Sequence, residues 1–168
     1  MLKIGDTVLY GATGVCSVEG MTEREIGKEK KQYFVLKPLA QDKCTVFVPA
    51  DNEALLKKAK KILSREEIYA VIDSVQPEPD IWEENEIKRR EQFGEIIHSG
   101  DRKKLMLLIR SLYNRREKRR AEGKRLHITD ERFMSEAERL LYDEFSAVLG
   151  IKQDEVVEFI INRINQKK

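Results

Sequence analysis

The sequence is poor in the residues from which metal sites and cofactor sites are usually built. Its 168 residues include only two cysteines and two histidines. Cys16 and Cys44 lie far apart in the chain, and neither has a histidine close to it in sequence. Since a structural zinc site needs four clustered ligands, we expect no metal and no cofactor. A disulfide is not expected either, because we expect a reducing compartment.

Long hydrophobic runs are also missing. No apolar stretch approaches the roughly 20 residues needed to cross a bilayer. The first six residues, Met-Leu-Lys-Ile-Gly-Asp, do not resemble the apolar part of a signal peptide. We therefore expect a cytoplasmic protein with no membrane partner.

Motifs for catalysis are absent as well. The chain has no glycine-rich phosphate loop and too few glycines for a dinucleotide fingerprint. His98 and His127 fall at predicted helix ends, without the serine and aspartate pattern that would make either one a catalytic base. The sequence therefore predicts that the protein is not an enzyme and has no small-molecule substrate.

Charge is plentiful but unevenly placed. Charged residues make up 37% of the chain, yet the net charge is only +2. From Arg102 to Arg125, eleven basic residues face only Glu117 and Glu122, a local balance of +9. Residues 78–86 hold five acidic residues and no basic one. Such blocks indicate either a surface that binds a polyanion or a solvated helix face.

The first sixty residues predict short β-strands. Four stretches rich in β-branched and aromatic residues alternate with turns that contain glycine or proline. The predicted strands are Asp6–Tyr10, Gly14–Gly20, Lys31–Lys37 and Cys44–Pro49. This spacing is typical of a small antiparallel barrel, in which closure hides the sheet edges.

From Ser64 onward the apolar residues recur at helical spacing. Ser64 and Glu67 form a predicted capping box, and Pro77 ends the first helix. Three further helices are expected to begin at the caps Asp80, Asp101 and Thr129, and a last helix contains residues 156–164. The predicted fold class is α+β with two modules, a β module over residues 1–59 and a five-helix module over residues 60–168.

Several segments resemble the CarD/CdnL family of bacterial transcription regulators. In the first module these segments are Ile4–Tyr10, Gly14–Val15, Tyr33–Lys37 and Thr45–Ala50. In the second module, the segment Ser99–Asp101 precedes a predicted helix with the sequence Leu-Ile-Arg-Ser-Leu-Tyr. The first module is also similar to the polymerase-interacting module of transcription-repair coupling factors. The resemblance covers nearly the whole chain and depends on the order and spacing of these segments.

The resemblance implies a fold and a function for each module. Residues 1–59 would form a Tudor-like barrel that binds the β subunit of bacterial RNA polymerase, partly by adding a strand to the polymerase's sheet. The helical module would contact promoter DNA through its backbone and minor groove, without sequence specificity, and would stabilise the open complex. The protein would then be associated with the nucleoid.

The resemblance also places the polymerase contacts. The family's polymerase-binding arginine matches Arg24, and its pairing strand matches Cys44, Thr45, Val46, Phe47 and Val48. Some family members carry a second arginine where this chain has Phe47. Phe47 therefore either replaces an ionic contact with an apolar one or packs inside the barrel.

The expected DNA contacts depart from the family pattern. The family's wedge tryptophan falls on Glu86, whereas the only tryptophan here, Trp82, lies one helical turn earlier. Trp82 is either a wedge in the minor groove or a residue packed against the proline-containing linker. The basic candidates are Lys88, Arg89 and Arg90, which match a basic cluster of the family, and Arg115, Arg116, Arg119 and Arg120 from the basic run.

Two alternatives remain open at the level of sequence. The acidic residues around Trp82 favour a polymerase-binding adaptor that has lost DNA contact. The arginine-rich helix favours an RNA-binding or ribosome-associated protein. Co-purification with polymerase subunits or with rRNA separates the last hypothesis from the other two.

Overall fold

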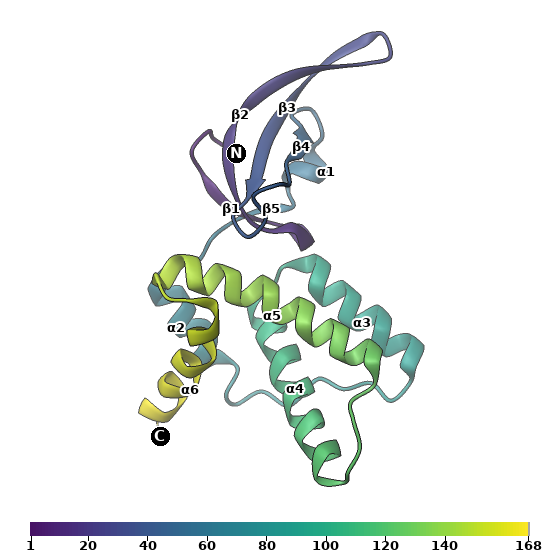
Figure 1. Ribbon diagram of the computed structural model, residues 1–168, viewed down its shortest axis with the longest axis vertical. Helices are drawn as coiled ribbons and strands as arrows, with labels where there is room; N and C mark the ends of the chain where they lie inside the picture. The colour runs from purple at the N-terminus through teal and green to yellow at the C-terminus, as the bar shows by residue number, and fades with distance from the viewer. Residues whose placement is uncertain (168) are drawn as a thin grey trace. The chain divides into compact units, whose positions relative to one another are not determined.

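The chain forms two compact units (Figure 1), described here from a computed structural model that covers residues 1–167. The first unit covers Met1–Ile62, and the second begins at Leu63. The boundary follows the last strand of the sheet, because that strand pairs with the first one and so belongs to the first unit. No helix within residues 1–167 is long and apolar enough to span a membrane.

A five-stranded antiparallel sheet makes up most of the first unit. Its strand order is β4-β3-β2-β1-β5. The elements are β1 (Thr7–Tyr10), the 3-10 turn η1 (Gly11–Thr13), β2 (Gly14–Ile26), β3 (Glu29–Pro38), β4 (Val46–Pro49), the short helix α1 (Glu53–Leu56) and β5 (Ala59–Lys61). The side chains of Cys16, Val18, Leu36 and Val48 are buried together and form its small core.

The β2–β3 hairpin is longer than the sequence predicts, and Figure 1 shows it as a long curved ribbon. Its pairing continues out to Ile26 and Glu29. The outer part is mostly polar and exposed, so no alternation of apolar residues marks it in the sequence. The turn contains Gly27 with a φ of 70°, a left-handed value that favours glycine. Arg24 lies in this outer part, opposite Lys31.

The predicted closed barrel is wrong, because the sheet stays open. β4 pairs with β3 and β5 pairs with β1, but β4 and β5 do not pair with each other. The segment that joins them contains α1 instead of a strand. Within residues 1–167, the outer edge of β4 therefore has no strand beside it. An edge of this kind is the geometry that strand addition requires.

The second unit is helical. It contains α2 (Arg65–Ser74), α3 (Glu86–Ser99), α4 (Arg102–Ala121), α5 (Ile128–Leu149), the 3-10 turn η2 (Gln153–Glu155) and α6 (Val156–Gln166). Residues 1–167 thus hold six α-helices where five were predicted, because Glu53–Leu56 forms the additional short helix α1 in the first unit.

Two helix starts agree with the sequence pattern. The Ser64 hydroxyl accepts from the Glu67 N–H at 3.1 Å, and the Glu67 carboxylate accepts from the Ser64 N–H at 2.7 Å. The Asp101 carboxylate accepts from the Lys104 N–H and caps α4. Side-chain acceptors at these positions satisfy backbone donors that a helix leaves free.

α3 begins later than predicted. Its cap is Asn85, whose side chain accepts from the Lys88 N–H. The predicted cap Asp80 has another role, because its carboxylate accepts hydrogen bonds from Arg110 and Asn114 of α4. These bonds hold the irregular segment before α3 against α4.

The predicted cap of α5 is also wrong. His127 caps the helix, and its Nδ1 accepts from the Thr129 N–H at 3.3 Å. The Thr129 hydroxyl instead accepts from Arg90 of α3 at 3.4 Å. The first turns of α3 and α5 are therefore linked by side chains.

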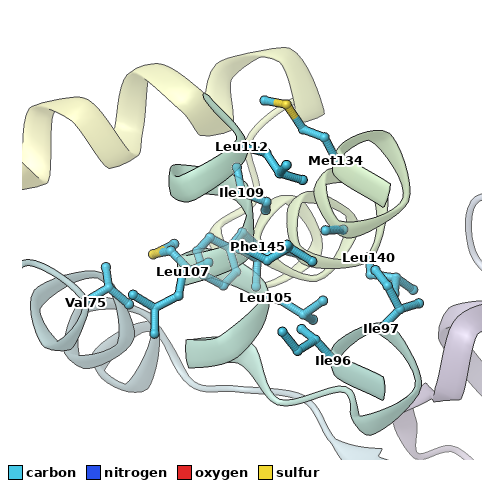
Figure 2. Packing of buried hydrophobic residues seen from close by; sticks show 14 of the residues in the cluster. Val75, Ile96, Ile97, Leu105, Leu107, Ile109, Leu112, Met134, Leu140 and Phe145 are labelled. Carbon is cyan, nitrogen blue, oxygen red and sulfur yellow. The ribbon is translucent and has the colours of Figure 1, made fainter. Parts of the chain in front are cut away.

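α4 lies at the centre of the core of the second unit. Its residues 105–112 are buried, apart from the half-buried Arg110. Figure 2 shows its side chains among residues from the neighbouring helices. The labelled residues are Leu105, Leu107, Ile109 and Leu112 of α4, Ile96 and Ile97 of α3, Met134, Leu140 and Phe145 of α5, and Val75 after α2.

α6 is held on α2 by an aromatic stack and an ion pair. The rings of Tyr69 and Phe159 stack with centroids 5.7 Å apart. Arg163 donates to both carboxylate oxygens of Asp73 at 3.1 and 2.7 Å. Hydrogen bonds from Arg163 and then Lys167 lower the pKa of Asp73 to about 2. The carboxylate is therefore ionised at neutral pH, as this ion pair requires.

Candidate functional site

The first candidate surface lies where the β2–β3 hairpin meets β4. The guanidinium carbon of Arg24 lies 3.5 Å from the centroid of the Phe47 ring. Arg24 is exposed and Phe47 is half-buried. A guanidinium that stacks on an aromatic ring keeps its N–H donors in its own plane, where they remain open to a partner. Phe47 therefore holds Arg24 beside the open edge.

The predicted pairing strand is only partly a strand. Cys44 and Thr45 precede β4, which begins at Val46. Val48 is fully buried and faces the core of the sheet. The outer backbone edge of β4 and the Phe47 ring are thus the parts of this segment that a partner strand would meet.

Cys16 takes no part in this surface, whereas Cys44 is half-buried just before β4. Both are free, and Cys16 is fully buried. Burial, with a smaller effect of Cys44, raises the pKa of the Cys16 thiol to about 11. The thiol therefore stays protonated at neutral pH and is a poor nucleophile. Residues 1–167 contain no group of three side chains that could hold a metal ion.

Trp82 packs against the core of the second unit. It is half-buried in the segment before α3, and its ring meets Phe93 edge-on with centroids 6.4 Å apart. Two guanidinium groups lie against the same indole, with carbon-to-centroid distances of 4.4 Å for Arg89 and 4.2 Å for Arg115. The indole Nε1 is buried and has no acceptor within residues 1–167.

Arg89 is buried, so the prediction that it contacts DNA is not supported by its position. It is 7% exposed and lies on the face of α3 that also carries Phe93. Its Nε and one Nη donate to the two oxygens of Asp130 at 3.1 and 3.3 Å. Its other Nη donates to the Glu83 carbonyl at 3.0 Å. All three nitrogens thus have acceptors inside the protein.

The other two residues of this predicted cluster are exposed. Lys88 has no carboxylate partner within residues 1–167, whereas Arg90 pairs with Glu86 one turn earlier. His127 Nε2 lies 3.9 Å from the same Glu86 carboxylate. Glu86, where the sequence resemblance predicts a tryptophan, thus lies beside both Arg90 and His127.

The four predicted arginines of α4 differ in their surroundings. They are Arg115, Arg116, Arg119 and Arg120. Arg116 and Arg120 lie 3.9 and 3.4 Å from Glu117. The Nε of Arg119 donates to the backbone carbonyl of Arg125 at 2.6 Å. Arg115 lies on the Trp82 indole. Arg115 and Arg119 have no carboxylate partner within residues 1–167.

A small cleft of about 250 Å³ brings some of these residues together. Trp82, Arg115, Arg119 and His127 line it. Sequence reasoning missed Asp130, which also lines the cleft and neutralises Arg89. No local pattern marks that pair, because its members are far apart in the chain.

Two family models match this sequence, one on each unit. The model of the CarD-like/TRCF RID domain matches residues 2–60, and that of the CarD C-terminal domain matches residues 67–161. A Bacillus subtilis (strain 168) protein described as "Putative transcription factor YdeB" is 22% identical over 163 residues. That match covers 95% of this chain and 99% of the relative.

Proposed function

Because this chain belongs to the CarD family, whose models match both of its units, we propose that it regulates transcription by binding the β subunit of RNA polymerase and contacting promoter DNA. The match to an RID domain indicates that the first unit interacts with RNA polymerase. The open edge of β4 beside the Arg24–Phe47 stack is the observation that carries the polymerase assignment. A β-subunit strand would add to this edge, and Arg24 would pair with an acidic residue beside it.

Charge reversal at Arg24 tests the polymerase contact. We expect Arg24→Glu to weaken binding to the isolated polymerase β lobe by about tenfold or more, because an attractive ionic contact becomes repulsive. Phe47→Ala should weaken binding by less, because Arg24 keeps its charge but loses the ring that holds it. Biolayer interferometry with immobilised β lobe measures both effects.

The control for Arg24→Glu is Lys3→Glu, which makes the same charge change at an exposed residue outside the hairpin and β4. It should leave the affinity nearly unchanged, and all three variants should keep the wild-type thermal transition. Unchanged affinity of a folded Arg24→Glu variant would contradict the assignment.

For DNA, we propose that exposed basic residues of the second unit bind the phosphate backbone without sequence specificity and so stabilise the open complex. Lys88 and Arg90 are exposed on α3 and Arg120 is exposed on α4, whereas Arg116 of α4 is half-buried and contributes only its outer part. Arg89 is left out because its nitrogens are already bound. The packing of Trp82 on Phe93 favours a structural role for its ring over a wedge role.

The salt dependence of DNA binding tests this assignment. We expect the double variant Lys88→Ala/Arg90→Ala to make the slope of log K against log salt shallower by up to about two units. Binding should weaken equally for unrelated duplex sequences, since phosphates carry no sequence information. Fluorescence anisotropy over a series of salt concentrations gives the slopes. The control is the double variant Lys3→Ala/Lys28→Ala, which removes the same charge from the first unit and should leave the slope unchanged. Equal slopes for the two double variants would contradict the assignment.

A polymerase adaptor without DNA contact is the second candidate. It is favoured by the Glu86 carboxylate, which pairs with Arg90 and so competes with phosphate for one of the proposed DNA ligands. The adaptor predicts normal binding to the β lobe, no DNA binding at low salt and no change in open-complex lifetime. Measuring these three properties on one preparation separates the two candidates.

A further inference from the structure

We propose that the cleft beside Trp82 binds a single phosphate group, with Arg115 and Arg119 as its principal ligands. The assignment of this phosphate to a nucleic-acid backbone rests on the proposed function, whereas the site itself does not. The cleft measures about 250 Å³, slightly below the roughly 300–1,000 Å³ of sites that enclose whole small molecules. A phosphate group suits a cleft of this size better than an entire cofactor does.

Arg115 is arranged to bind an anion. Its guanidinium lies 4.2 Å from the centroid of the Trp82 ring, and it has no carboxylate partner within residues 1–167. Stacking occupies the face of the guanidinium and leaves the in-plane N–H donors available. Because the side chain is already held by the indole, less rotamer freedom is lost when an anion binds.

Arg119 adds a second fork of donors one helical turn away. Its Nε is bound to the Arg125 carbonyl at 2.6 Å, which fixes the guanidinium while its terminal nitrogens have no carboxylate partner within the described residues. Residues four apart on a helix project from the same side. Arg115 and Arg119 can therefore bind oxygens of one phosphate group.

The charge balance of the cleft favours an anion. Among its acidic residues, Asp130 is neutralised by the buried Arg89. Glu84 is the opposing charge, and it is exposed to solvent, where its repulsion is screened. Two arginines without carboxylate partners in residues 1–167 thus face one exposed carboxylate.

The Trp82 indole contributes its ring to the site, not its N–H. Its Nε1 is buried without a hydrogen-bond partner in residues 1–167. Buried polar groups in native proteins nearly always have a partner, because leaving one unpaired costs free energy. Because solvent in the cleft does not reach this N–H, an anion there does not reach it either, and the role of Trp82 in the site is to hold Arg115 in place.

The experiment uses the fact that Trp82 is the only tryptophan of the chain. The full chain is titrated with sodium phosphate, against sodium chloride of equal ionic strength, and with a short DNA duplex, while tryptophan emission is recorded. We expect both phosphate-bearing ligands to change the emission and chloride to leave it unchanged. A response to DNA alone would assign the site to a phosphodiester, and a response to phosphate alone would assign it to a free phosphate group.

Variants separate the site from general electrostatics. Arg115→Gln and Arg119→Gln should each raise the phosphate concentration that gives half of the emission change by about tenfold, because each removes a charged donor. Arg119→Gln leaves the Trp82 stack intact and so remains informative if Arg115→Gln disturbs folding. Lys152→Gln removes the same charge at an exposed residue between α5 and α6 and should respond as wild type does.

Two results would overturn the site: no emission change with either ligand, or wild-type responses from both arginine variants. If the site fails while β-lobe binding and the salt-dependent DNA binding persist, the proposed function stands without it. If those two activities are absent while phosphate still changes the emission, the site stands and the proposed function fails.

Discussion

Replacement of Glu144 by alanine is expected to lower the free energy of unfolding of the second unit by about 3–5 kcal/mol. Glu144 is fully buried in α5, and its two oxygens accept from Arg102 at 2.8 and 2.9 Å. One of them also accepts from the Leu63 N–H at 2.9 Å. The substitution removes the two Glu144 acceptors from the buried guanidinium and one from this N–H, and these losses add to the cost of the cavity.

Urea unfolding followed by circular dichroism measures this effect, and the thermal midpoint should fall by more than about 10 °C. Glu136→Ala on the same helix is the matched control. Glu136 pairs with Arg139 at 2.7 Å, but its side chain is 39% exposed. Exposed pairs contribute less than about 1 kcal/mol. A Glu144→Ala variant as stable as this control would show that Arg102 is satisfied in another way.

Asp130→Ala should be destabilising by a similar amount, about 3–5 kcal/mol, for the same reason. The Asp130 side chain is 3% exposed, and its loss leaves the Arg89 guanidinium buried and charged. The variant should also change the Trp82 emission spectrum, because Arg89 lies against the indole. If Asp130 stabilised only another part of the unit, its replacement would leave the Trp82 emission spectrum unchanged.

A double variant completes the test of the Arg89–Asp130 pair. Arg89→Met/Asp130→Leu removes both charges and retains apolar volume, so it should recover most of the lost stability. Glu131→Ala, at an exposed neighbouring position, is the control and should change stability by less than about 1 kcal/mol. If the double variant is as unstable as Asp130→Ala alone, loss of packing rather than an unpaired charge is the cause.

The parts of the fold that the sequence predicts well are those encoded locally. The Ser64–Glu67 capping box and the Asp101 cap involve residues three apart, so their geometry follows from helix periodicity alone. The apolar stripe of α4 is visible for the same reason. The edges of the sheet are not predictable in this way, because whether β4 and β5 pair depends on residues far apart in sequence.

In the candidate site, the burial and the partners of charged residues are equally hard to predict from the sequence. Arg89 follows Lys88 and precedes Arg90, and a run of three basic residues gives the impression of one exposed cluster. Only the helical phase of α3 and the distant partner Asp130 reveal that the middle residue is buried. Asp80 is a plausible cap by spacing, but its contacts with Arg110 and Asn114 arise from tertiary packing. Sequence patterns indicate which residues are charged, whereas their partners follow from the fold.

The open edge of β4 also affects how the free protein behaves in solution. An edge that accepts a partner strand equally accepts the edge of another copy, and such pairing is a common route to aggregation. β4 limits this risk because it is only four residues long and ends at Pro49, which lacks a backbone N–H. Substitutions that extend this strand would lengthen the open edge and raise the risk of aggregation.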